Sequence, residues 1–252
     1  MIYFSEINIF ILAAFIVAIA GLIRGFTGFG NMIVMSPGLS LIFGPVVAIP
    51  MIYIIELPIV SFFFLKFFKK IQWKEILLLV ITSLLFAPVG LILLKNLNAE
   101  IINKWIGITV VLVSLILFFN FKINIKGKYF PQFFFGSLSG LIGGSTGLGG
   151  PPIVSYFLIS NFTADQIRSN ITGTFFIRVT ISIIFTIILG MMSLKIFLEA
   201  IVLIPIYLLF SLIGDFLYKY SKLQGKKVKN SQKMSKSFFA VQHKIKEKRF
   251  FY

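Results

Sequence analysis

The sequence contains no cysteine and a single histidine, His243, among its 252 residues. Without cysteine there is neither a disulfide framework nor thiolate chemistry, and one histidine excludes a histidine-ligated metal site. Acidic residues are also scarce, with 8 Asp and Glu against 24 Lys and Arg, and they are not clustered. An enzyme acting within the membrane is therefore the least favoured class, and we expect no cofactor and no bound metal.

Apolar residues are abundant, at 58% of the chain compared with about 45–50% in a soluble domain. They form long runs, so the sequence predicts an all-α polytopic membrane protein with about eight or nine helical segments. Several runs reach the ~20 residues that cross a bilayer. The segments 31–44, 130–143 and 151–161 are shorter, and are either half-helices or re-entrant arms. The other expected segments are 7–24, 46–65, 75–95, 102–121, 171–190 and 196–218.

Basic residues gather in the loops near 66–74 and 121–130 and in the chain after Tyr218, where eleven Lys or Arg accompany one acid. Cytoplasmic loops carry such an excess, so we expect a protein of the cell membrane whose N-terminus lies outside the cell and whose C-terminus lies in the cytoplasm. This bias explains the basic end more simply than nucleic-acid binding does. The first apolar segment follows no Lys or Arg and precedes no cleavage site, so we expect a span rather than a signal peptide.

A glycine-rich stretch occurs twice at a constant offset of 119 residues. The ten residues from Gly21 to Gly30 align without gaps on Gly140 to Gly149, and seven are identical. Chance matching of glycines is the alternative, but Leu, Ile and Thr match as well. We expect two inverted repeats, residues 1–121 and 122–218, followed by a basic tail, 219–252. Paired glycine breaks in membrane helices point to a transporter's binding site near the midplane.

The motif Gly147-Leu-Gly-Gly-Pro151, with Gly28-Phe-Gly30 and Ser36-Pro-Gly-Leu39 in the first half, resembles the sulfite exporter TauE/SafE family. This family is also called the toluene sulfonate uptake permease family, and the resemblance covers most of residues 8–218. It implies secondary export or uptake of sulfite, organosulfonates and related anions. Two departures stand out: Asn31 replaces a second glycine, and a basic tail replaces the usual last hydrophobic segment.

Three ionisable residues lie within apolar segments, where charge is costly and usually functional. We expect Arg24 to bind the anion through its planar fork of donors, although a snorkelling arginine at a helix end is the alternative. Glu56 is either a structural ion-pair partner or a proton-carrying coupling residue. Arg178 is a second candidate anion ligand, ranked above Arg168, which we expect at the membrane interface.

The remaining candidate substrate-binding residues belong to the breaks themselves. Hydroxyl groups there either face the substrate or cap a helix, and new helix N-termini favour an anion. These candidates are Thr27, Gly28, Gly30, Asn31, Ser145, Thr146, Gly147, Gly149, Gly150 and Pro151.

The leading hypothesis is thus a secondary transporter of a small sulfur-containing anion, coupled to protons. The alternative is an anion channel, or a carrier for an unrelated small anionic metabolite. The expected partners are the anion and the lipid bilayer. The sequence leaves open whether the protein forms homo-oligomers.

Overall fold

A computed structural model describes residues 7–119, 129–159 and 162–249 of the chain. These residues contain nine α-helices, a short 3-10 turn and no strand, so the predicted all-α class is confirmed. Most of the basic loop expected at 121–130 lies outside the described residues. The helices are α1 (Ile7–Thr27), α2 (Asn31–Phe43), α3 (Pro45–Phe67), α4 (Trp73–Asn96), α5 (Ala99–Phe119), α6 (Tyr129–Thr146), α7 (Gly150–Ile159), α8 (Ala164–Ile188) and α9 (Leu194–Arg249).

Five helices in the described part of the chain are long and apolar enough to cross a membrane: α1, α3, α4, α8 and the Leu194–Ser221 part of α9. The protein is therefore a multi-pass membrane protein. The helices that follow the two breaks are short, with 13 residues in α2 and 10 in α7. At 1.5 Å per residue they extend about 20 and 15 Å, less than the ~30 Å hydrocarbon layer.

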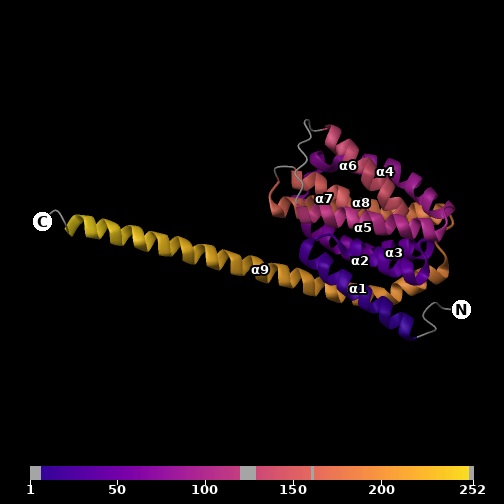
Figure 1. The fold of residues 1–252 in the computed structure, drawn as a ribbon, viewed down its shortest axis with the longest axis horizontal. Helices are drawn as coiled ribbons and strands as arrows, with labels where there is room; N and C mark the ends of the chain where they lie inside the picture. Colours follow the sequence, from indigo (N-terminus) through magenta and orange to yellow (C-terminus); the bar gives the residue numbers. More distant parts are fainter. Residues whose placement is uncertain (1–6, 120–128, 160–161, 250–252) are drawn as a thin grey trace.

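The helices form two tightly packed pairs on opposite sides of the bundle. The α4–α6 pair lies along one side and the α1–α9 pair along the other, with α3 packed against α8 between them (Figure 1). The basic end of the chain continues α9 as one helix that leaves the bundle (Figure 1).

Glycine allows the backbones of α1 and α9 to touch. A Cβ on Gly21 would lie 2.9 Å from the carbonyl oxygen of Tyr207, and one on Gly25 would lie 2.8 Å from the nitrogen of Asp215. A Cβ on Gly214 would lie 2.8 Å from the nitrogen of Phe26. Real side chains do not fit at these distances, so the close approach requires glycine.

The α4–α6 pair repeats this contact with residues at equivalent positions. Gly140 and Gly144 follow Gly21 and Gly25 by 119 residues, and a Cβ on Gly144 would lie 2.8 Å from the nitrogen of Leu91. Gly90 precedes Gly214 by 124 residues. A Cβ on Gly90 would lie 2.8 Å from the nitrogen of Ser145, the same distance as between a Cβ on Gly214 and the nitrogen of Phe26. The two halves of the chain therefore use the same helix contacts.

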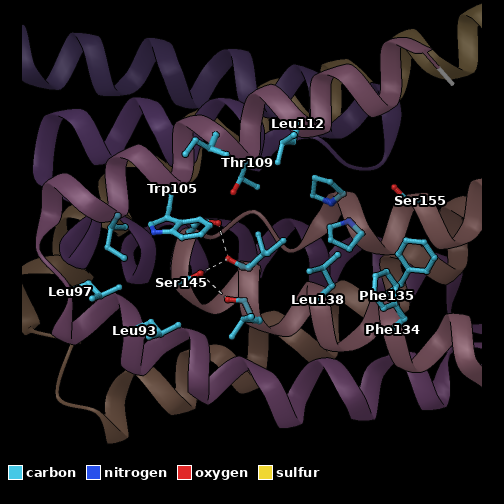
Figure 2. Close-up of a pocket in the computed structure, with 17 residues that line it drawn as sticks. Leu93, Leu97, Trp105, Thr109, Leu112, Phe134, Phe135, Leu138, Ser145 and Ser155 are labelled. Atoms are coloured by element: carbon cyan, nitrogen blue, oxygen red, sulfur yellow. Dashed lines mark hydrogen bonds between the residues drawn. The ribbon is translucent and has the colours of Figure 1, made fainter. Parts of the chain in front are cut away.

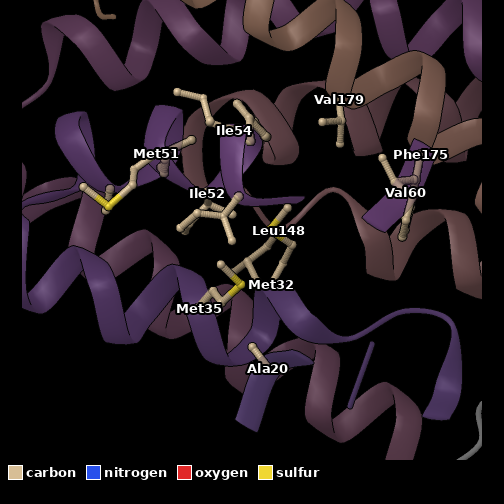
Figure 3. Packing of buried hydrophobic residues seen from close by; sticks show 14 of the residues in the cluster. Ala20, Met32, Met35, Met51, Ile52, Ile54, Val60, Leu148, Phe175 and Val179 are labelled. Atoms are coloured by element: carbon tan, nitrogen blue, oxygen red, sulfur yellow. The ribbon is translucent and has the colours of Figure 1, made fainter. Parts of the chain in front are cut away.

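Helix α3 passes through the centre of the core. Every residue from 48 to 56 is buried, as expected of a helix that other helices surround. Met32 and Met35 of α2, Leu148 of the second break and Phe175 and Val179 of α8 belong to the same cluster of buried residues (Figure 3). Both breaks thus lie against the middle of the bundle.

Candidate functional site

The two breaks have the same backbone geometry at their first glycine. The nitrogen of Gly28 donates to the carbonyl of Arg24 at 2.9 Å, and that of Gly147 donates to the carbonyl of Gly143 at 2.9 Å. Their φ angles are 86° and 77°, in the left-handed region that favours glycine. The aligned sequences therefore end two helices in the same way.

Threonine hydroxyls cap both breaks. Thr27 donates to the carbonyl of Ile23 at 2.8 Å, and Thr146 donates to that of Ile142 at 2.7 Å. Each also accepts from the backbone two residues on, at 3.1 Å for Thr27 and 3.3 Å for Thr146. Ser145 donates to Leu141 at 2.9 Å. In this structure the hydroxyls of Thr27, Ser145 and Thr146 thus form hydrogen bonds within their own helices. Helix capping was the alternative to substrate binding in the sequence analysis.

The breaks differ at their last glycine. Gly30 has a φ of 87° and precedes α2, whereas Gly149 does not adopt a positive φ. Gly149 is required for space instead, because a Cβ there would overlap the guanidinium of Arg178 and lie 2.6 Å from the carbonyl of Ser139.

Side chains from other helices bring the two breaks together. The hydroxyl of Ser36, on α2, donates to the carbonyl of Thr146. The ring of Phe175, on α8, lies 5.4 Å below the guanidinium carbon of Arg24 and would be 3.1 Å from a Cβ on Gly150. Segments 119 residues apart in the sequence therefore share one buried region.

Arg24 and Glu56 form an ion pair in this region. Nε of Arg24 lies 3.3 Å from Oε1 of Glu56, and their side chains are 0% and 1% exposed. The geometry is incomplete, because none of the three guanidinium nitrogens has a hydrogen-bond partner among the described residues. Arg24 is thus buried rather than snorkelling, and most of its donors are unused.

Two neutral polar side chains beside this pair also lack partners. Asn31, the first residue of α2, lies near Glu56 and near Tyr207 of α9, and Tyr207 lies near Arg24, but none of these contacts has the geometry of a hydrogen bond. Neither amide atom of Asn31 nor the hydroxyl of Tyr207 has a hydrogen-bond partner in the described part of the chain. Buried polar groups are nearly always satisfied, so this cluster has the donors for a small polar ligand.

Arg178 approaches the second break from α8. Its Nη1 donates to Ser139, at 3.3 Å to the carbonyl and 3.2 Å to the hydroxyl, and the guanidinium fills the space beside Gly143. Tyr53 donates to the carbonyl of Gly143 at 2.6 Å. The charge of Arg178 also acts on Glu56, so the structure brings together the three ionisable residues singled out in the sequence.

Sequence reasoning missed three residues of this region: Tyr53, Ser139 and Tyr207. The two tyrosines and the serine interrupt apolar runs, a weak signal that could have drawn attention to them. Arg168, which the sequence analysis ranked below Arg178 and expected at the membrane interface, has a side chain that is 8% exposed and donates to the carbonyl of Gly25 at 2.6 Å.

A separate cavity of about 540 Å³ lies between α4, α5, α6 and α7 (Figure 2). Its walls are mainly apolar, with Trp105, Leu112 and Phe134 among them, and Ser145, Thr146 and Pro151 of the second break also line it. Arg24, Glu56 and Arg178 do not line it, so the cavity is distinct from the charged cluster.

The fold and the cluster define a multi-pass helical membrane protein with ionisable groups buried at two helix breaks. The sulfite exporter TauE/SafE family matches residues 13–228, which include both breaks. The chain belongs to this family of membrane transporters, as its glycine motifs indicated. Comparison with curated proteins found no match, and comparison with solved structures found none either.

Proposed function

We propose that this protein is a secondary transporter of a small sulfur-containing oxyanion, such as sulfite or a sulfonate, and that Arg24 is its main ligand. The observation that carries the proposal is the fully buried guanidinium of Arg24, whose nitrogens have no hydrogen-bond partner among the described residues. An oxyanion presents several acceptors to such a fork of donors. The amide of Asn31 and the hydroxyl of Tyr207 would add two further donors.

The charges of the cluster support an anionic substrate. Two arginines and one carboxylate leave one positive charge in excess when all three are ionised. Burying an uncompensated charge is costly, so the surplus favours binding of a counter-ion. The permanent charge of arginine would maintain this preference at every physiological pH.

The helix N-termini favour the first break as the position of the anion. Helix α2 starts at Asn31, and free N–H groups in its first turn would face an anion favourably. The first turn of α7 contains Pro151 and Pro152, which have no N–H to donate. Gly28, Gly30 and Asn31 would therefore contribute more to binding than Gly147, Gly149, Gly150 and Pro151.

Coupling to protons would use Glu56. If this carboxylate took up a proton, the surplus of positive charge would grow and the anion would bind more tightly. Proton and anion would then bind cooperatively, and each would promote binding of the other by the same factor. The result is proton–anion symport in the direction that the gradients drive.

We further propose that the halves form an inverted repeat with a cytoplasmic C-terminus. The matched glycine contacts of α1–α9 and α4–α6 support equivalent halves. Five helices, an odd number, separate the start of α1 from the start of α6, so equivalent helices would enter from opposite sides. A C-terminal reporter active only outside the cytoplasm would contradict this orientation.

Thermal unfolding of the purified full chain in the presence of sulfite, thiosulfate, sulfate and small sulfonates tests the binding site. A ligand that binds only the folded protein raises the melting temperature, and at a given concentration a tighter ligand raises it more. The wild type should be stabilised by at least one of these anions. The double variant Arg24→Ala/Glu56→Gln should lose most of that stabilisation, because it removes the donors without leaving Glu56 charged and unpaired.

Lys104 provides the matched control, because its side chain is 70% exposed and pairs with Glu100 on the surface of α5. Lys104→Ala removes one positive charge from the protein and should leave the anion-dependent shift unchanged. An equal shift in the wild type and in Arg24→Ala/Glu56→Gln would show that the anion does not bind at Arg24.

A further inference from the structure

A second group of charges lies near the ends of three membrane helices. The carboxylate of Asp215, on α9, accepts from Lys66 of α3 at 2.7 Å and from Lys219 of α9 at 2.9 Å. Its other oxygen accepts from Nη2 of Arg168, on α8, at 2.9 Å. Three cations thus surround one carboxylate, which leaves two positive charges in excess.

Arg168 is held rigidly in this group. Its guanidinium lies 4.2 Å from the ring centre of Tyr218 and 5.7 Å from those of Phe63 and Phe67. Its Nη2 also donates to the carbonyl of Gly25. Aromatic faces and a fixed hydrogen bond orient a planar guanidinium before any ligand arrives, which lowers the entropic cost of binding.

The fold does not require charges at three of these four positions. At the offsets of 124 and 122 residues that relate α4 to α9 and α3 to α8, the equivalent residues in the other half are Leu91 for Asp215, Ile188 for Lys66 and Val46 for Arg168, whereas Lys219 corresponds to Lys95. Leu91 is fully buried. The same packing is therefore possible with apolar residues in place of Asp215, Lys66 and Arg168. The charges of these three side chains need an explanation other than packing.

The group is open on one side and adjoins the first break on the other. The side chains of Lys66 and Lys219 are 29% and 57% exposed, whereas those of Asp215 and Arg168 are 5% and 8% exposed. A Cβ on Gly28 would lie 3.1 Å from Cγ of Arg168. Ten residues of α8 separate Arg168 from Arg178, which corresponds to about 15 Å along the helix.

We propose that Lys66, Arg168 and Lys219 form a second anion site, and that the carboxylate of Asp215 occupies it in this conformation as an internal ligand. A small oxyanion, the substrate class of the proposed function on which this inference rests, displaces the carboxylate on its way to or from Arg24. The two lysines attract the anion, and Nη2 of Arg168 then binds one of its oxygens as it now binds Oδ1 of Asp215.

Removal of the internal ligand tests this site. Sulfite binding is measured by calorimetry on the full chain in detergent, at constant ionic strength, in the Arg24→Ala/Glu56→Gln background that lacks the central site. Adding Asp215→Asn should raise sulfite affinity at least tenfold, because the competing carboxylate is gone. Adding Arg168→Gln as well should abolish the gain. Affinity that is unchanged or weaker with Asp215→Asn would overturn the proposal.

A variant of the exposed residue Lys219 keeps the test decisive if Asp215→Asn does not fold. Lys219→Gln alters an exposed side chain and should lower sulfite affinity about threefold or more in the same background, whereas Lys104→Gln should not. Equal affinities in these two variants would overturn the second site. Failure of the central site is distinguishable, because the Arg24→Ala/Glu56→Gln background would then bind sulfite as tightly as the wild type.

Discussion

The two breaks combine one backbone geometry with two different charge arrangements. In the first, Arg24 extends from the broken helix itself and pairs with Glu56 of α3. In the second, Gly143 takes the place of Arg24, and the space beside it is filled by Arg178 of α8. Glu56 and Arg178 have corresponding contacts 122 residues apart, since Glu56 lies against Arg24 as Arg178 lies against Gly143. Tyr53 and Phe175 show the same offset, because Tyr53 contacts Gly143 and Phe175 contacts Arg24. The glycine motif therefore determines where the helices end, and single substitutions determine the chemistry.

The largest expected effect is the loss of the second break's shape. Gly149→Val should abolish transport and folding, because the new side chain would overlap the guanidinium of Arg178. Gly30→Val should cost less, since the nearest atom to its Cβ is a methyl carbon of Ile23 at 3.2 Å, although its positive φ adds roughly 1–2 kcal/mol of strain. Detergent-solubilised yield and sulfite flux into liposomes would measure both. A milder defect in Gly149→Val than in Gly30→Val would reverse the comparison.

Loss of Arg178 should weaken binding without abolishing folding. Arg178→Ala removes the surplus positive charge, and hydrogen bonds to charged groups contribute about 1.5–3 kcal/mol, so anion affinity should fall roughly 10- to 100-fold at every pH. Calorimetric titration between pH 5.5 and 8 would measure this change. Wild-type affinity in Arg178→Ala would mean that the charge of Arg178 does not contribute to anion binding.

The smallest expected change concerns Glu56. Glu56→Gln imitates the protonated carboxyl group, so anion binding should persist while its dependence on pH weakens. Titrations of the wild type and the variant across the same pH range provide the measurement, with Glu100→Gln on the surface of α5 as the matched control. Parallel pH profiles in the wild type and Glu56→Gln would leave Glu56 as a structural partner of Arg24.

Local chemistry made the breaks and the ionisable residues predictable. Glycine and proline end helices wherever they gather, and Arg24, Glu56 and Arg178 are visible because charge is rare in apolar runs. Tyr207 and Arg168 were not predictable in the same way. Tyr207 reaches the cluster because α9 packs against α1, and Arg168 is buried because Asp215 and Tyr218 of α9 and Phe63 and Phe67 of α3 surround it. Such pairings depend on contacts between distant segments.

The glycine contacts of the two helix pairs have a mechanical consequence. Backbones that touch along Gly21, Gly25 and Gly214 on one side, and along Gly90, Gly140 and Gly144 on the other, cannot slide past each other without first separating. We therefore expect each helix pair to move as one rigid body. If the buried arginines become accessible from alternate sides of the membrane, we expect the two helix pairs to rock about α3 and α8, with the breaks as the hinges.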